Sequence, residues 1–347
     1  SIDNSLLQQE IFIFYYFGMN IIDWSAIIIT IILQTVFFTV GMQYNKKIIN
    51  FSAMTVYAGL LIFFFVVLLS DVKITTEAFS NIFNLNNFLD VNNLAPLLTV
   101  AGTIFAYFSI LIISFGDFSR YVKNEQELKK GNLSLILNLI IFSFLSVFIV
   151  IGSDVFLNQK FSDIDRIFTN PTDIVGKFDN IQITIVVLFF IIIASASTNL
   201  VANFIPSQYS LINFAPSILS LKSASYLIAF FGLLIAIFWL TILSQIGILS
   251  FVDTFGAFFG PLFGVMAADY YLIKNQELSN KDLYSLDKES AYYYSGGWHI
   301  KGVYSLILGF IFSASTIWNT NLMFLQSYAW IIGAFVAWIT YYLLAKK

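Results

Sequence analysis

A group of small and hydroxyl-bearing residues interrupts one of the most apolar stretches of the chain. In FFIIIASASTNLVANFIP, residues 189–206, large apolar side chains give way to short and polar ones. If the stretch is helical, Ala194, Ser197 and Thr198 lie at i, i+3 and i+4 and share one face. Two hydroxyls and a backbone carbonyl there are hard oxygen ligands suited to a small alkali cation. Close helix packing through small residues, which is common in membranes, explains the same pattern.

A second stretch combines a candidate helix break with a cluster of aromatic rings. Residues 95–115 contain Gly102, followed by Phe105, Tyr107 and Phe108. A broken membrane helix frees backbone groups that can bind a ligand, as in secondary transporters, and an aromatic ring can stack on a planar molecule. Because the chain contains 39 Phe residues, the alternative is that such a cluster faces lipid or the protein core.

Few charged side chains lie in or beside the apolar stretches. Asp117 and Arg120, at i and i+3, suit a surface pair or a latch to a neighbouring loop. Asp253 lies inside an apolar stretch, near its outer end, and is either a candidate proton site or a carboxylate satisfied by solvent or polar neighbours. We expect Asp269 and Tyr270 to anchor the cytoplasmic end of that helix at the membrane interface.

The elements that carry these residues must be membrane helices. Of the 347 residues, 59% are hydrophobic and only 11% are charged, which predicts an all-α integral membrane protein. The absence of cysteine and the single histidine exclude a disulfide framework and a histidine-built metal centre. Without a phosphate-binding loop, a catalytic triad or a nucleic-acid patch, we expect neither an enzyme nor a nucleic-acid partner.

Nine stretches have about the 20 residues that a bilayer requires. They are residues 23–41, 51–70, 95–115, 133–153, 181–205, 225–244, 248–272, 302–319 and 327–345. A shorter apolar piece, residues 6–18, is expected to be the distal half of a further helix. We therefore expect the sequence to be an N-terminally truncated piece of a longer protein.

Basic residues predict the orientation of these helices. Most of the 17 Lys and Arg residues fall in alternate connections, namely Lys46 and Lys47; Arg120, Lys123, Lys129 and Lys130; Lys222; Lys274, Lys281, Lys288 and Lys301; and Lys346 and Lys347. The positive-inside rule places these connections, and with them the C-terminus, in the cytoplasm. We therefore expect a multi-pass protein of the plasma (cytoplasmic) membrane.

Four motifs resemble those of a known family, in the same order. DFSRY at 117–121 resembles the end of the sixth helix of the nucleobase:cation symporter-1 family, the permeases for cytosine, uracil, allantoin, hydantoins and related compounds. TNLVAN at 198–203 resembles its eighth helix. FGPLFGVMAADYY at 259–271 and DLY at 282–284 are similar to its tenth helix and the following loop. The resemblance covers essentially the whole chain.

The resemblance implies a fold as well as a function. The fold would be the LeuT-like inverted five-plus-five helix repeat of sodium-coupled amino-acid transporters, as a single permease domain over residues 1–347. The chain would then hold the end of helix 3 through helix 12. Helices 1 and 2 would be missing, and with them part of both binding sites.

The resemblance further implies a cation site. By position, Ala194 would supply a carbonyl and Ser197 and Thr198 hydroxyls to the coupling ion, Na⁺ or H⁺. Sodium is favoured because these residues include no titratable group. No other cofactor is expected.

A substrate site is implied on two helices. Asn203 matches the amide that hydrogen-bonds the substrate ring, since Asn offers both a donor and an acceptor. Phe108 falls where the family has a stacking aromatic, usually Trp, and Phe105 or Tyr107 would serve in a different register. Gly102 would admit the break that opens this helix to the ligand.

The implied protein is a secondary active transporter. It would import a nucleobase or related planar heterocycle, of the uracil, cytosine, allantoin or hydantoin type, by cation symport with alternating access. The alternatives are an amino-acid or vitamin (thiamine-type) carrier of the same superfamily and a non-transporting membrane receptor. The four motifs favour the heterocycle transporter.

Overall fold

The computed structural model describes residues 15–40, 42–70, 72–82, 91–160, 174, 181–238, 248–283, 285 and 287–346. Within these ranges the chain is helical with intervening turns, and its only β-type pairs are two isolated bridges. The predicted all-α membrane architecture is confirmed, because nine of the described helices are long and apolar enough to cross a membrane. The inverted repeat stays a prediction.

The nine membrane-length helices overlap the nine predicted spans. They run over Ile21–Thr39, Tyr44–Leu69, Leu94–Ile113, Glu125–Asp154, Thr184–Phe214, Leu221–Phe238, Phe251–Ile273, Ile300–Trp318 and Thr320–Ala345. The partial helix predicted at 6–18 lies outside the described residues except for 15–18, where the prediction is wrong. Phe17 and Gly18 have positive φ angles of 52° and 79°, which a right-handed helix cannot accommodate.

The chain forms two compact units, each assembled from two separate segments. The first comprises Ser1–Phe88 and Asp117–Thr241, and the second Leu89–Gly116 and Ile242–Lys347. The boundary between the segments Leu89–Gly116 and Asp117–Thr241 falls within the short helix α7 (Phe115–Ser119). The single permease domain predicted over 1–347 stays a prediction.

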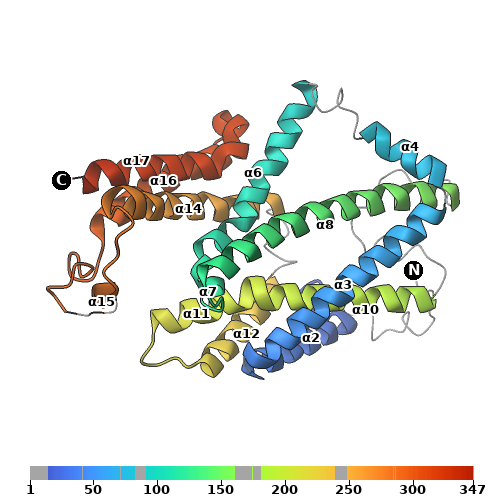
Figure 1. The fold of residues 1–347 in the computed structure, drawn as a ribbon, viewed down its shortest axis with the longest axis horizontal. Coiled ribbons are helices and arrows are strands. Elements are labelled where there is room, and N and C mark those ends of the chain that lie inside the picture. The colour runs from blue at the N-terminus through green and yellow to red at the C-terminus, as the bar shows by residue number, and fades with distance from the viewer. Residues whose placement is uncertain are drawn as a thin grey trace. The chain divides into compact units, whose positions relative to one another are not determined.

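Long apolar helices make up the first unit (Figure 1). Its elements are α2 (Ile21–Val40), α3 (Met42–Ser70), α4 (Val72–Ile82), α8 (Glu125–Lys160), α10 (Ile181–Thr198), the π-helical segment η2 (Asn199–Phe204), α11 (Ile205–Phe214) and α12 (Leu221–Phe238). α3 packs against α8 and α10, and α2 packs against α12. Many large apolar side chains on these helices remain exposed, as expected for surfaces that contact lipid.

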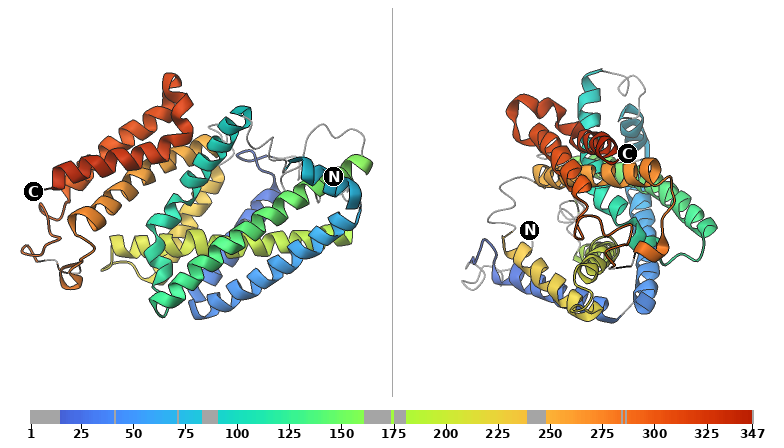
Figure 2. Two further views of the ribbon diagram at one scale, coloured as in Figure 1. Left: turned by 45° about the horizontal axis from the view of Figure 1, so that its top comes forward. Right: turned by 90° about the vertical axis from the view of Figure 1, so that its left-hand side faces the viewer.

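The second unit is built around α14. Its elements are α6 (Val91–Ile113), α14 (Ile248–Ala268), the π-helical segment η4 (Asp269–Ile273), α15 (Asn280–Leu283), α16 (Ile300–Trp318), the 3₁₀ helix η5 (Thr320–Tyr328) and α17 (Ala329–Ala345). α14 packs against α6, α16 and α17. Both views of Figure 2 show α14, α16 and α17, coloured orange to red, side by side.

Two glycines let α14 and α17 approach closely. A Cβ atom on Gly260 would collide with the carbonyl oxygen of Trp330, and one on Gly264 with that of Ala334. Since apolar helices in lipid gain little from hydrophobic burial against each other, such close packing is a main source of their association.

Candidate functional site

The helix that carries the TNLVAN motif changes its hydrogen bonding within that motif. α10 ends at Thr198, and the next six residues, Asn199–Phe204, form the π-helical segment before α11 begins. The N–H of Ile205 accordingly donates to the carbonyl of Leu200, five residues back. Pro206 gives one physical reason, because it has no N–H and its ring would clash with the carbonyl four residues earlier in an α-helix. Such segments are frequent at functional sites.

The three predicted cation ligands lie on the last turn of α10. The hydroxyl of Ser197 donates to the carbonyl oxygen of Ala194 at 3.1 Å, so two of the predicted ligand oxygens lie side by side. Thr198 is exposed and borders the π segment. A hydroxyl that donates its proton keeps its lone pairs, and oxygens of this kind suit a small hard cation, although three are fewer than such ions usually take. The cation site stays a prediction.

A row of amide side chains leads to Asn203. Its Nδ2 donates to Oδ1 of Asn199 at 2.8 Å, and Nδ2 of Asn199 donates to Oε1 of Gln34 in α2 at 2.6 Å. Asn203 is exposed, and its Oδ1 and second N–H make no hydrogen bond within the described part of the chain. The row fixes the plane of the amide and leaves one donor and one acceptor for a ligand.

The aromatic residues of the predicted substrate helix lie on α6 in the second unit. The break predicted at Gly102 is absent, because α6 continues unbroken from Val91 to Ile113. Gly102 instead allows close packing, since a Cβ there would collide with the carbonyl oxygen of Ser327. Phe105 stacks on Trp330 with ring centroids 5.7 Å apart.

Tyr107 and Phe108 meet edge to face. Their ring centroids are 5.3 Å apart and their planes differ by 80°. Tyr107 is 62% exposed, whereas Phe108 is half-buried. Of the three aromatic candidates, Phe108 therefore has the ring most confined by its surroundings while still partly open.

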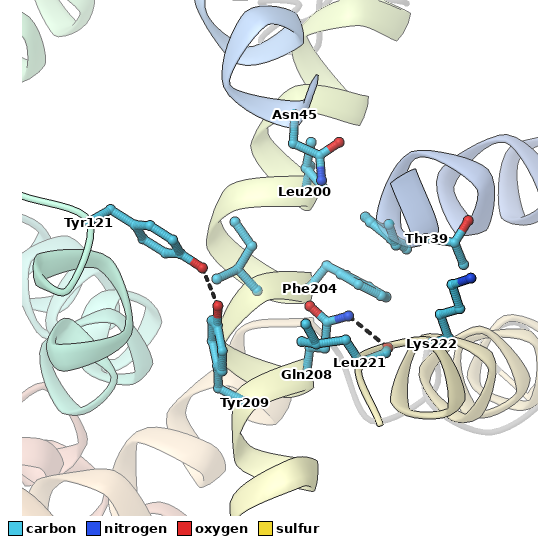
Figure 3. A pocket seen from close by; sticks show the side chains of 11 residues that line it. Thr39, Asn45, Tyr121, Leu200, Phe204, Gln208, Tyr209, Leu221 and Lys222 are labelled. Carbon is cyan, nitrogen blue, oxygen red and sulfur yellow. Dashed lines mark hydrogen bonds between the residues drawn. The ribbon is translucent and has the colours of Figure 1, made fainter. Parts of the chain in front are cut away.

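The DFSRY motif connects to α11. Arg120 pairs with Asp117 at 3.9 Å, and its guanidinium lies 4.3 Å from the ring centroid of Tyr209. The hydroxyl groups of Tyr121 and Tyr209 form a hydrogen bond (Figure 3). Burial raises the pKa of Asp117, and the neighbouring Arg120 lowers it. Burial and the bond to Tyr209 raise the pKa of Tyr121, so the Tyr121 phenol keeps its proton in this contact between the motif and α11.

Asp269 takes part in a hydrogen-bonded chain at one end of the second unit. Tyr341 of α17 donates to Oδ1 of Asp269 at 2.6 Å, and Nε2 of His299 lies 2.7 Å from the Tyr341 hydroxyl. Tyr294 stacks on the His299 ring, with centroids 3.9 Å apart. The prediction that Asp269 and Tyr270 form an interfacial anchor did not include Tyr341, which lies 72 residues away in the sequence.

A cavity of about 190 Å³ lies beside the π segment in the first unit (Figure 3). Phe204 and Tyr209 contribute aromatic walls, and Gln208 donates to the carbonyl of Leu221 at 2.9 Å. Asn45 is only 5% exposed, and its Oδ1 has no hydrogen-bond partner among the described residues. This cavity was not predicted from the sequence.

Comparison with known proteins supplies an independent line of evidence. Residues 13–341 match a family model described as permease for cytosine/purines, uracil, thiamine, allantoin. The chain is 28% identical to an allantoin permease of Bacillus subtilis over 244 residues, which are 70% of this chain and 48% of that protein.

Two other relatives are also named as permeases. A purine-uracil permease of Arabidopsis thaliana is 26% identical over 255 residues, 70% of this chain and 41% of the relative. A hydantoin permease of Microbacterium maritypicum is 29% identical over 144 residues, 41% of this chain and 28% of the relative. The chain spans about half the length of the first of these relatives. No solved structure matches it.

Proposed function

Because the chain belongs to the family of permeases for cytosine and purines, uracil, thiamine and allantoin, we propose that it imports a nucleobase or related planar heterocycle. The observation that carries this proposal is the family match over residues 13–341, on a chain with nine membrane-length helices in its described part. The named relatives are permeases, so we infer transport rather than catalysis.

The chemistry of Asn203 supports the proposed substrate class. Its amide is oriented by Asn199 and Gln34 and keeps a donor and an acceptor available. A ring with an adjacent N–H and C=O, as in uracil, allantoin or hydantoin, complements this pair. Phe108 is the proposed stacking partner, and a Phe ring in place of the family's usual Trp offers a smaller face.

Sodium is the proposed coupling ion, held by the carbonyl of Ala194 and the hydroxyls of Ser197 and Thr198. The π segment begins directly after Thr198 and includes Asn203, so an ion that orders one end of this segment also orders the amide at the other. Because such coupling is reciprocal, substrate must tighten ion binding by the same factor. Import then proceeds by alternating access, with the C-terminus in the cytoplasm of a plasma-membrane protein.

Radiolabelled uptake into proteoliposomes tests the proposal. Uracil, cytosine, allantoin and hydantoin are offered with and without an inward sodium gradient. We expect sodium-stimulated uptake of one ring, lost in Thr198→Ala and Asn203→Ala. Two matched variants should keep it, because Ser195→Ala removes a hydroxyl off the predicted ligand face and Asn213→Ala removes an exposed amide of α11.

Different outcomes test the coupling ion, the substrate class and the transport function separately. Uptake that follows a proton gradient and survives Thr198→Ala would contradict the sodium site but not the transport function. Uptake of thiamine or an amino acid, and of none of the four rings, would favour the vitamin or amino-acid carrier. Ring binding without uptake would favour a receptor.

A further inference from the structure

The second unit contains a buried carboxyl group that the proposed site does not use. Asp253 lies in α14, within the membrane-length span Phe251–Ile273, and is only 7% exposed. Its Oδ2 accepts a hydrogen bond from Nε2 of Gln326 in η5 at 2.8 Å. Thr103 of α6 supplies a second hydrogen bond. One carboxyl group therefore connects α14, η5 and α6.

The described helices around Asp253 provide no cation to pair with it. α6, α14, η5 and α17 contain no Lys, Arg or His. In α16 the basic residue is Lys301, in the first turn, whereas η5 follows the opposite end of that helix. Asp269, the next acid along the same helical stretch, lies about four turns away. The remaining titratable groups of these elements are tyrosines, namely Tyr107, Tyr270, Tyr271, Tyr304, Tyr328, Tyr341 and Tyr342.

An unpaired carboxylate in such surroundings is costly. Burial without a counter-charge disfavours the ionised form, and neutral donors offset only part of that cost. Among the described residues no counter-charge is available, so the carboxyl group is left to bind either a proton or a metal cation. Gln326 turns its N–H toward the carboxyl oxygen, whereas a cation site would require its amide oxygen there. We propose that Asp253 is a reversible proton-binding site.

The proton site is built into the contact between α6 and η5. Thr99 and Ser327 exchange a hydrogen bond at 3.0 Å between their hydroxyls, and Gly102 packs on the Ser327 carbonyl. With Asp253 protonated, this contact consists of neutral groups only. Deprotonation of Asp253 places a negative charge in the contact between α6 and η5. The charge favours a position of these helices in which water reaches the carboxylate.

Proton binding is thereby linked to the position of α6. The consequence for transport rests on the proposed function, because α6 carries Phe108, the proposed stacking ring. Suppose that a heterocycle binds better when Asp253 is protonated and α6 packs on η5 through neutral groups. The bound heterocycle must then raise the proton affinity of Asp253 by the same factor by which the proton raises the affinity for the heterocycle.

Infrared spectroscopy of the purified protein in liposomes detects the proton directly. Ordinary Asp and Glu side chains are ionised at neutral pH, so a protonated carboxyl gives a separate C=O stretching band that shifts in D₂O. We expect the band in the wild type, its loss in Asp253→Asn, and its retention in Asp287→Asn, which removes an exposed carboxyl of the same unit. A wild type without the band, or a band that survives Asp253→Asn, overturns the proposal.

A second variant keeps the test decisive if Asp253→Asn fails to fold. Gln326→Leu removes the Nε2 donor while leaving the carboxyl in place. The band should then move to higher frequency, because the C=O group has lost a hydrogen bond. An unchanged band in Gln326→Leu shows that it arises from another residue and overturns the assignment.

The linkage is tested by the pH dependence of heterocycle binding. Above the midpoint of the Asp253 titration, one linked proton weakens the apparent affinity by up to about tenfold per pH unit. Asp253→Asn, which mimics the neutral group, should bind without this dependence. If the infrared band is present and no heterocycle binds, the proton site stands and the proposed function fails; pH-independent binding by the wild type overturns the linkage.

Discussion

At the scale of single residues, the amide of Asn203 is oriented by other side chains. Asn199 and Gln34 form a row that reaches from the π segment to α2. Amides between membrane helices commonly form such bonds, each worth about 1 kcal/mol. The orientation of Asn203 therefore depends on two residues that need not touch the substrate.

Substitution of Asn203 tests its direct role. We expect Asn203→Ala to weaken equilibrium binding of the transported ring by about 1–3 kcal/mol, because it removes a donor and an acceptor. The Asn213→Ala variant serves as the control. Equal affinities of the wild type and Asn203→Ala would place the substrate elsewhere.

Gln34 should affect substrate binding indirectly, through Asn199 and Asn203. Gln34→Leu leaves Asn203 intact but removes the acceptor for Asn199, and we expect binding to weaken by about 0.5–1.5 kcal/mol. The double variant Gln34→Leu/Asn203→Ala should bind no more weakly than Asn203→Ala alone, since orientation is irrelevant once the amide is gone. Additive effects in this cycle would contradict an orienting role.

We expect His299 to make the stability of the protein depend on pH. Burial lowers its pKa, Asp269 raises it, and Lys274 and Lys301 lower it, with a net decrease from 6.5. The unfolded state therefore binds the proton more readily, so this contribution to stability is complete above pH 6.5 and is lost as pH falls below it. Thermal unfolding between about pH 7.5 and about pH 5.5 should show the decrease. His299→Gln should flatten it, and an unchanged slope would exclude His299 as its source.

At the residue scale, the helical face shared by Ala194 and Ser197 was predictable, whereas contacts between distant residues were not. The spacing of Ala194 and Ser197 predicted a shared face, and the two residues do share a hydrogen bond. The contacts of Asn199 with Gln34 and of Asp269 with Tyr341 join residues 165 and 72 positions apart. Helical periodicity carries no information about such partners, because they depend on which helices pack together.

At the scale of elements, the spans were predictable because each is apolar over a bilayer's thickness. The π segment at Asn199–Phe204 was not, since hydropathy does not distinguish π from α hydrogen bonding. The expected break at Gly102 was wrong for a related reason. Glycine permits either a break or a close approach, and here the Ser327 backbone occupies the space that a side chain would need.

Glycine substitutions test the packing of α14. Gly260→Ala introduces a Cβ that collides with the Trp330 carbonyl, and we expect a loss of about 1–3 kcal/mol from overpacking. Gly232→Ala in α12 meets no atom within 4 Å and should be neutral or stabilise by up to about 1 kcal/mol. Thermal unfolding in detergent compares them, and equal melting temperatures would exclude tight α14–α17 packing.

At the scale of the whole molecule, the absence of cysteine allows a direct test of orientation. Lys222→Cys lies in a connection predicted to be cytoplasmic, and Asn319→Cys in one predicted to be outside. A membrane-impermeant maleimide applied to intact cells should label only Asn319→Cys, and both after permeabilisation. Labelling of Lys222→Cys in intact cells would reverse the assigned topology.

The family was predictable from four motifs in order, and the match over residues 13–341 confirms it. The substrate and the coupling ion stay predictions for a physical reason. Each depends on a few polar contacts, whereas relatives named for allantoin, for purines and uracil, and for hydantoin are all similar to this one chain. The proposed stacking of the substrate on Phe108 is one such contact.

The π segment also has a mechanical consequence. It accommodates one residue more than an α-helix of the same number of turns. If it moves by one position along the helix, each residue that it passes turns by about 100° around the axis. Such a shift within residues 199–204 would change the direction in which the Asn203 side chain points, while Ala194 and Ser197 before the segment and α11 after it would keep their positions.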